Sequence, residues 1–156
     1  KLRAVADLRA EGVDLYLVAR TDARATHGMD EALARGRAAR AAGADAVFVE
    51  APRDAAELAV VGRELAGGTL VANMVEGGRT PLLPPPELAA MGFGVVLWGI
   101  TGILAAGRAL ADAYGAIAAR GTSAGRPLMA FGELTDAVGL PAHQERERRY
   151  APEGEA

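Results

Sequence analysis

Four short hydrophobic runs recur along the chain, separated by longer stretches that mix polar and apolar residues. They begin near Asp14, Ala46, Thr69 and Gly94, and they are rich in β-branched and aromatic side chains. Strands of a parallel sheet are covered on both faces, so their sequences are continuously hydrophobic rather than alternating. The four runs therefore predict four buried parallel strands.

Segments with helical composition and spacing lie between and around these runs. A stretch rich in Ala, Leu, Arg and Glu predicts a helix over 29–42, with Asp30 as its N-cap and Gly43 just past its end. Asp54 and Glu57 have the spacing of a capping box, which predicts a helix start at Asp54. The other predicted helices are 1–10, 54–65, 87–91 after three prolines, 103–119 and 128–138, and the charged tail from Glu145 is predicted to be solvated and frayed.

The alternation of strands and helices predicts the architecture. The strand starts are roughly 23 to 32 residues apart, close to the ~31 residues per unit of an eight-unit (β/α) barrel. Four units are half of such a barrel, and the chain opens inside a helix without Met. We therefore expect the last four units of a (β/α)8 TIM barrel in 1–121, followed by a helical segment and charged tail in 122–156. An open, doubly wound sheet of four strands is the alternative.

Composition and charge exclude several classes of function. The 156 residues include 17 Lys plus Arg and 20 Asp plus Glu, for a net charge of -3. Nucleic-acid binders need clustered positive charge, so we expect no nucleic-acid partner. The absence of cysteine excludes disulfides, thiolate zinc sites and a cysteine nucleophile, and it is compatible with the cytoplasm, where we expect the protein. No apolar run approaches the ~20 residues that span a bilayer, so we expect no membrane association.

Polar residues close three of the predicted strands. Arg20 ends the first strand and is followed by Asp22, Glu50 ends the second, and Asn73 ends the third. Ligands of parallel α/β folds bind at the carboxyl ends of the strands. A guanidinium, a carboxylate and an amide gathered there are suited to binding a small organic acid. The alternative is that Arg20 and Glu50 only pair with each other, and that Asp22 orders its own loop.

Three sequence stretches resemble a known family in residues, order and separation. They are Ala-Arg-Thr-Asp-Ala at 19–23, Gly-Ala-Asp-Ala-Val-Phe-Val-Glu-Ala-Pro at 43–52, and Ala-Asn-Met-Val-Glu-Gly-Gly-Arg-Thr-Pro at 72–81. Over about 14–119 the chain is similar to the isocitrate lyase/phosphoenolpyruvate mutase superfamily, nearest to its methylisocitrate lyase and carboxyvinyl-carboxyphosphonate phosphorylmutase-like members. The resemblance implies a (β/α)8 barrel that uses Mg2+ to cleave or rearrange bonds in small 2-oxo or 2-hydroxy acids.

The resemblance also implies roles for individual residues. Arg20 is expected to bind a carboxylate or phosphonyl group of the substrate, and Glu50 and Asn73 are expected to line the same site. Asp22, Thr80 and Glu76 are secondary candidates, with Thr80 mainly shaping the loop in which it lies. Glu50-Ala51 stands where phosphonate-forming mutases carry His-Ser, which favours a carbon-carbon lyase or a decarboxylase.

The metal-binding part of the family pattern is not in this sequence. In the family an Asp-x-Asp pair and a Lys-Arg-Cys-Gly-His loop precede the strands present here, so we expect the Mg2+ ligands to lie outside this chain. The expected activity of the complete protein is that of a methylisocitrate lyase-like enzyme. The alternatives are an oxaloacetate decarboxylase, a carboxyphosphonoenolpyruvate phosphonomutase, a catalytically inert half-barrel, and a phosphate-binding barrel of another family that uses Gly99 to Gly102.

The expected assembly follows from the half-barrel. Its first and fourth strands would each leave an edge without a neighbour, and unpaired edges invite pairing with another chain. We therefore expect a homo-oligomer or association with a complementary half-barrel.

Overall fold

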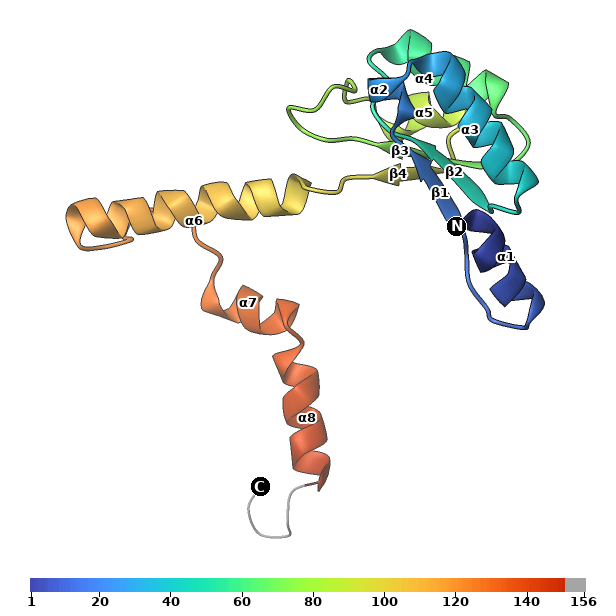
Figure 1. The fold of residues 1–156 in the computed structure, drawn as a ribbon. Helices are drawn as coiled ribbons and strands as arrows, with labels where there is room; N and C mark the ends of the chain where they lie inside the picture. Colours follow the sequence, from blue (N-terminus) through green and yellow to red (C-terminus); the bar gives the residue numbers. More distant parts are fainter. Residues whose placement is uncertain (151–156) are drawn as a thin grey trace. The chain divides into compact units, whose positions relative to one another are not determined.

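The computed structural model describes residues 1–150, in which four strands form one parallel sheet (Figure 1). The strands are hydrogen-bonded in chain order, so the expected α/β arrangement with four parallel strands is confirmed. They are β1 (Val18–Thr21), β2 (Ala46–Val49), β3 (Thr69–Asn73) and β4 (Val95–Leu97).

The first strand begins later than the sequence pattern predicts. The hydrophobic run starts near Asp14, but regular pairing starts at Val18. The backbone N–H of Leu17 donates to the Asp45 carboxylate at 2.6 Å. A side chain thus binds the backbone just before the strand, a contact that hydrophobicity alone does not reveal.

Eight helices are assigned within residues 1–150. They are α1 (Leu2–Ala10), α2 (Ala23–Thr26), α3 (Met29–Ala41), α4 (Ala55–Glu64), α5 (Pro85–Ala90), α6 (Thr101–Arg120), α7 (Phe131–Ala137) and α8 (Leu140–Tyr150). The short α2, directly after β1, was not predicted. Two of the three prolines lie inside the first turn of α5, where their missing N–H groups cost no helical hydrogen bond.

The helix ends confirm some predicted caps and correct others. The N-cap of α3 is Gly28 rather than Asp30, and Asp30 instead lies in the first turn, where negative charge favours the helix dipole. Gly43 has the predicted left-handed conformation, with φ of 90°. Asp54 caps α4 by accepting the Glu57 N–H at 2.8 Å.

The charged tail is helical where the structure describes it. Residues 145–149 belong to α8 and are exposed, so the expected solvation is confirmed and the expected fraying is wrong for these residues. The i,i+4 pair of His143 and Glu147, at 3.2 Å, is consistent with a helix. Residues 152–154 of the predicted tail lie outside the described residues.

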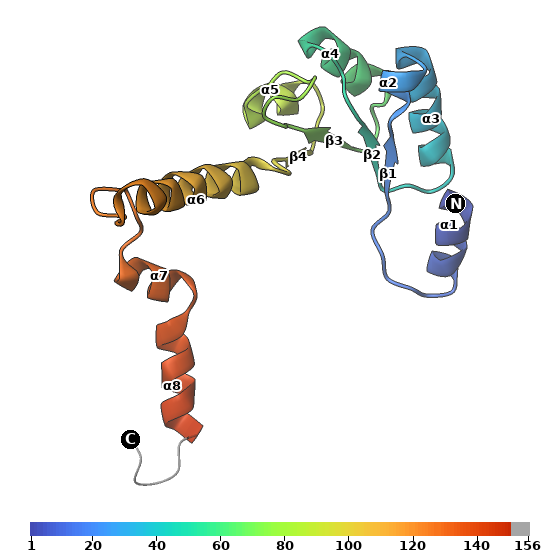
Figure 2. The ribbon, with the colours of Figure 1, turned by 60° about the vertical axis from the view of Figure 1, so that its left-hand side comes forward.

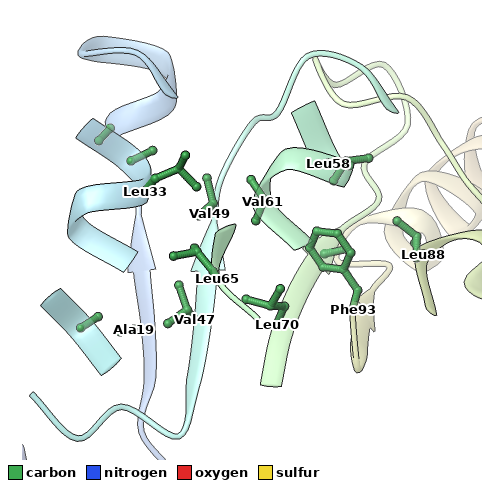
Figure 3. Close-up of a cluster of buried hydrophobic side chains, with 14 of the residues drawn as sticks. Ala19, Leu33, Val47, Val49, Leu58, Val61, Leu65, Leu70, Leu88 and Phe93 are labelled. Atoms are coloured by element: carbon green, nitrogen blue, oxygen red, sulfur yellow. The ribbon is translucent and has the colours of Figure 1, made fainter. Parts of the chain in front are cut away.

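The two faces of the sheet have different surroundings. The helices α3, α4 and α5 cover one face, where the main core forms (Figures 2 and 3). Its members include Leu33, Val47, Val49, Leu58, Val61, Leu65, Leu70 and Leu88. A second cluster of Ala46, Phe48 and Val71 comes from alternate positions on β2 and β3, which place it on the opposite face. Arg20 is the register partner of Phe48, so it belongs to this second face.

The chain divides into two compact units, residues 1–107 and residues 108–156. The first contains the sheet. The described part of the second contains the rest of α6 with α7 and α8, and an ion pair between Asp112 and Arg126 at 3.8 Å joins α6 to the segment that follows it. The expected division at residue 121 remains a prediction. Among the described helices, none has the length and apolar character needed to cross a membrane.

Candidate functional site

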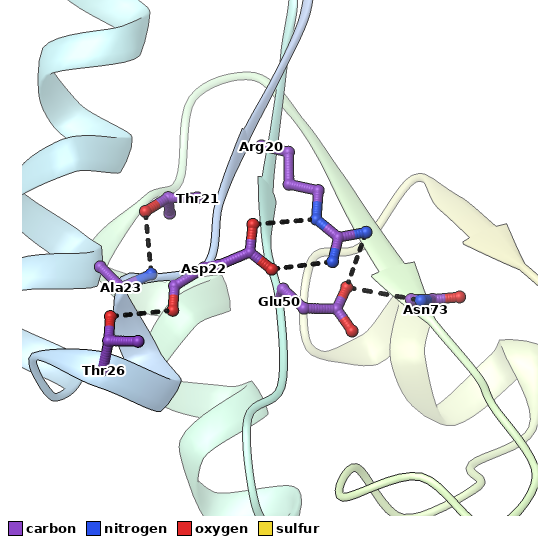
Figure 4. Close-up of polar contacts among 7 residues, drawn as sticks. All are labelled: Arg20, Thr21, Asp22, Ala23, Thr26, Glu50 and Asn73. Atoms are coloured by element: carbon purple, nitrogen blue, oxygen red, sulfur yellow. Dashed lines mark hydrogen bonds and ion pairs between the residues drawn. The ribbon is translucent and has the colours of Figure 1, made fainter.

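The structure brings the polar strand-end residues together at the carboxyl edge of the sheet. Arg20 lies on β1, and Glu50 directly follows β2, where its backbone N–H donates to the Thr21 carbonyl at 3.0 Å. Asn73 is the last residue of β3. The parallel register of three neighbouring strands therefore places a guanidinium, a carboxylate and an amide side by side (Figure 4).

Two carboxylates hold the guanidinium of Arg20. Its Nε donates to Asp22 Oδ2 at 3.2 Å and its Nη2 donates to Asp22 Oδ1 at 2.8 Å. Its Nη1 lies 3.3 Å from Glu50 Oε2. The hydrogen bonds with Asp22 raise the pKa of Arg20, with Glu50 adding to the effect, and the same bonds lower the pKa of Asp22.

Arg20 keeps hydrogen-bond donors for a ligand although it is paired with two carboxylates. A guanidinium carries five N–H groups, and the hydrogen bonds with Asp22 use one on Nε and one on Nη2. The second N–H of Nη2 and both N–H groups of Nη1 make no hydrogen bond within residues 1–150, although Nη1 forms an ion pair with Glu50. The alternative that Arg20 and Glu50 pair with each other is correct as a description of the contact, yet it does not exhaust the donors of Arg20.

Asn73 connects to Arg20 through Glu50. Its Nδ2 donates to Glu50 Oε2 at 3.4 Å, near the long limit for such a bond. The same carboxylate oxygen thus receives contacts from Arg20 and from Asn73. The three side chains form one network, and the amide oxygen of Asn73 remains an acceptor in it.

Asp22 is held through its backbone as well as its side chain. Thr26 Oγ1 donates to the Asp22 carbonyl at 3.4 Å. The Thr21 hydroxyl accepts the Ala23 N–H at 3.2 Å (Figure 4). The short helix α2 therefore fixes the turn from which Asp22 reaches back to Arg20.

A cavity of about 400 Å³ is lined by these residues. Five of the six residues singled out in the sequence line it, namely Arg20, Asp22, Glu50, Asn73 and Thr80. The sixth, Glu76, is not among the lining residues. It accepts a hydrogen bond from the Thr101 hydroxyl at the start of α6.

Arg79 and Ala51 are among the lining residues that were not singled out from the sequence. Arg79 brings a second guanidinium to the cavity, and Ala51 follows Glu50 in a left-handed conformation with φ of 60°. Arg79 lies in the loop after β3, so the rule that directed attention to strand ends applies to it as well. No sequence signal marks Ala51, because left-handed φ is usually signalled by Gly or Asn.

A larger cavity of about 570 Å³ lies beside β1, α1 and α3. Its lining combines apolar residues such as Leu2 and Ala39 with Arg20 and Asp22, which also line the smaller cavity. We place the candidate site in the smaller cavity because the polar ends of three strands meet there. Convergent polar groups, rather than volume, distinguish a site for a charged ligand.

The acidic residues of the described chain do not fit a complete Mg2+ site. Within residues 1–150, no three His, Asp or Glu side chains gather as metal ligands. The two carboxylates at the site, Asp22 and Glu50, are both engaged by Arg20. Mg2+ in proteins prefers nearly octahedral oxygen coordination, which this pair does not provide, so no chemical step is assigned to a metal on these residues.

Comparison with protein families and curated proteins gives one consistent result. The family model described as phosphoenolpyruvate phosphomutase matches residues 1–118. The chain is 42% identical over 153 residues to 2,3-dimethylmalate lyase of Eubacterium barkeri, covering 97% of this chain and 52% of that protein. It is also 42% identical over 143 residues to the chloroplastic carboxyvinyl-carboxyphosphonate phosphorylmutase of Arabidopsis thaliana, covering 88% of this chain and 42% of that protein.

Solved structures agree with the sequence matches. A crystal structure of 2,3-dimethylmalate lyase matches with a TM-score of 0.88 at 32% identity, over 98% of this chain and 51% of that one. Oxaloacetate acetylhydrolase in complex with 3,3-difluorooxalacetate matches with a TM-score of 0.88 at 30% identity, over 98% and 52%. Phosphonopyruvate hydrolase in complex with oxalate and Mg2+ matches with a TM-score of 0.81 at 26% identity, over 97% and 54%. The chain thus spans about half the length of these relatives.

Proposed function

Because the chain belongs to the phosphoenolpyruvate mutase/isocitrate lyase superfamily, we propose that it supplies the substrate-binding wall of a carbon-carbon lyase acting on a small 2-oxo or 2-hydroxy carboxylic acid. The proposal rests on one observation above all. Arg20 lines a cavity together with Glu50 and Asn73 and keeps N–H groups on both terminal nitrogens that make no hydrogen bond within residues 1–150. Such donors can bind a substrate carboxylate.

Each residue has a proposed role. Arg20 binds a substrate carboxylate, Asp22 orients the guanidinium, and Glu50 and Asn73 orient the hydroxyl or oxo group of the substrate. Thr80 shapes the loop, because its hydroxyl donates to the Pro52 carbonyl at 2.7 Å. We assign no substrate contact to Glu76, since its carboxylate binds Thr101 away from the cavity lining.

The proposal also concerns the segments of the barrel that lie outside this chain. We propose a complete (β/α)8 barrel in which segments outside this chain provide the Mg2+ ligands and the acid-base groups. Magnesium there would supply positive charge to the oxygen on which negative charge develops when the carbon-carbon bond breaks. The residues of this chain hold the acid in place. The cytoplasm is the proposed compartment.

Assembly is proposed from the sheet edges. The strands β1 and β4 each have one neighbour in the described sheet, so each has a side open to pairing. We propose that a complementary half-barrel or a second copy of the chain covers them. Analytical ultracentrifugation of the 156-residue chain tests this: a monomer at tens of micromolar contradicts association with itself.

A direct assay tests the lyase proposal. The protein that contains this chain together with the rest of its barrel is incubated with Mg2+ and with 2,3-dimethylmalate, 2-methylisocitrate or oxaloacetate, and the keto-acid or acetate product is measured. Arg20→Ala is expected to reduce kcat/KM by about 10- to 100-fold, because a charged hydrogen-bond partner of the substrate is lost. Arg63→Ala, which breaks an exposed ion pair with Glu64 on α4, is the matched control.

The outcomes separate the alternative functions. Turnover of a phosphonate substrate without turnover of any of these acids favours a phosphonomutase, a reading supported by the 42% identity to the Arabidopsis thaliana phosphorylmutase. Absence of turnover by the 156-residue chain alone, with turnover by the longer protein, favours an inert half-barrel when isolated. Full activity of Arg20→Ala contradicts the assigned role of Arg20.

A further inference from the structure

The backbone just after Glu50 adopts an unfavourable conformation. Within residues 1–150, Ala51 is the one residue other than glycine with positive φ, at 60°. This left-handed conformation brings the Cβ of an L-residue close to the following carbonyl oxygen. Such conformations persist when surrounding contacts hold them. The segment 51–54, which we call the Glu50 loop, therefore needs contacts that keep it in place.

An ion pair holds one side of the Glu50 loop. Arg24 on α2 donates from Nε to Glu57 Oε2 at 2.8 Å and from Nη2 to Glu57 Oε1. Glu57 Oε2 also accepts the backbone N–H of Arg53 at 2.8 Å. The side chains of Arg24 and Glu57 are 11% and 23% exposed, so the pair is partly shielded from solvent. These contacts connect the segment after β1 to the segment after β2.

A hydroxyl holds the other side of the loop. Thr80 Oγ1 donates to the Pro52 carbonyl at 2.7 Å, which connects the segment after β3 to the same loop. The loop is thereby tied at two successive residues, Pro52 and Arg53, to its neighbours on both sides. Glu50, the residue just before the loop, carries the carboxylate that contacts Arg20 and Asn73.

We propose that Arg24 and Glu57 are positioning residues that act through the Glu50 loop to set the Glu50 carboxylate against Arg20. The inference rests on the proposed function, in which Glu50 orients the substrate. Neither Arg24 nor Glu57 is among the residues lining the 400 Å³ cavity, so any effect of theirs on ligand binding is indirect. The lowered pKa of Glu57, caused mainly by its hydrogen bonds with Arg24, is consistent with a carboxylate that stays charged at neutral pH.

Ligand binding tests the proposal in the protein that contains this chain and the rest of its barrel. Oxalate is the probe, with affinity measured by calorimetry in the presence of Mg2+ at a temperature well below unfolding. Arg24→Ala is expected to weaken oxalate binding at least fivefold. Arg37→Ala is the matched control, because Arg37 pairs with Glu64 between α3 and α4 at 3.8 Å, and it is expected to change the affinity by less than twofold.

A double-mutant cycle separates positioning from general destabilisation. If Arg24 acts through Glu50, the Glu50→Gln variant has already lost the carboxylate that Arg24 positions. Adding Arg24→Ala to that variant is then expected to weaken oxalate binding by less than a further twofold. Effects of the two substitutions that multiply independently overturn the proposal. The proposal is also overturned if Arg24→Ala binds oxalate with wild-type affinity while Arg20→Ala does not. That outcome does not count against the proposed function.

Hydrogen exchange gives a readout that needs no ligand. The Arg53 N–H is bonded to Glu57, so Arg24→Ala and Glu57→Gln are each expected to raise its exchange rate at least tenfold relative to Arg37→Ala. An unchanged rate overturns the inference even if oxalate does not bind the wild-type protein. Failure of oxalate to bind the wild-type protein, together with fast exchange in Arg24→Ala, counts against the proposed function and supports the loop contact.

Discussion

Arg20 and Phe48 are register partners on neighbouring strands, and the guanidinium carbon of Arg20 lies 4.9 Å from the centroid of the Phe48 ring. A cation over an aromatic face at this distance is attracted by the ring quadrupole. Arg20 is thus held by a ring from β2 as well as by two carboxylates. The orientation of the guanidinium is set before any ligand arrives.

Replacing Phe48 tests how much its ring contributes to orienting Arg20. Phe48→Leu keeps a large apolar side chain and removes the aromatic face, so we expect oxalate affinity to fall about three- to tenfold, corresponding to ~0.5–1.5 kcal/mol. Phe93→Leu is the matched control, because both rings are 6% exposed and Phe93 belongs to the helix-covered core. Equal losses of affinity in the two variants contradict the prediction.

Arg79 is predicted to distinguish acids with one and two carboxylates. Arg20 is balanced by Asp22 and Glu50, whereas no ion pair within residues 1–150 involves Arg79, which lines the same cavity. A second carboxylate therefore has a second cation available. Arg79→Gln is expected to weaken malate binding about three- to fivefold, consistent with ~1 kcal/mol for an exposed ion pair, and lactate binding by less than twofold.

The two ligands form the internal control for that experiment, since both are 2-hydroxy acids and they differ by one carboxylate. Arg3→Gln on α1, an exposed arginine outside this cavity, controls for the change in net charge. An equal loss of affinity for malate and lactate would show that Arg79 does not bind the second carboxylate.

The residues at the strand ends could be predicted from the sequence, whereas the contacts between loops could not. Arg20, Glu50 and Asn73 were predictable as neighbours because they close successive strands, and parallel pairing brings such ends to one edge. Just before β1, the Asp45 carboxylate binds the Leu17 N–H, across 28 residues of sequence. Such a contact leaves no trace in hydrophobic periodicity.

Other features that the sequence did not predict also lack a signal in the hydrophobic pattern. The N-cap of α3 was assigned to Asp30 from side-chain preference, yet Gly28, with φ of 98°, occupies it. Arg24, which pairs with Glu57, lies on α2, a helix of four residues. A helix that short carries no periodic pattern, so hydrophobic spacing does not predict it.

The ion pair of Arg24 and Glu57 is predicted to make stability depend on pH in the acidic range. The pKa of Glu57 is lowered in the folded protein, chiefly by its hydrogen bonds with Arg24, so the unfolded chain takes up the proton first as the pH falls. The stabilisation is therefore complete above the ordinary glutamate value, about 4.3, and is lost as the pH falls through the lowered value.

Thermal unfolding of wild type and Glu57→Gln measures this loss. The difference in Tm between them is expected to be constant from pH 7 to about 5 and to shrink below about 4. Glu31→Gln, which removes an exposed i,i+4 pair with Arg35, is expected to give a smaller difference in Tm. A difference for Glu57→Gln that grows as the pH falls below 4 contradicts the assignment.

Ala51 is predicted to store strain that glycine relieves. Left-handed φ costs an L-residue roughly 1–2 kcal/mol, whereas glycine adopts it freely but loses about 0.5–1 kcal/mol of backbone entropy on folding. Ala51→Gly is therefore expected to raise the free energy of unfolding by up to about 1 kcal/mol, measured by urea denaturation. Ala89→Gly on α5, exposed and inside a helix, is the matched control and is expected to lower it by about 0.5–1 kcal/mol. Losses of equal size in the two variants would show that the left-handed conformation at Ala51 carries no strain.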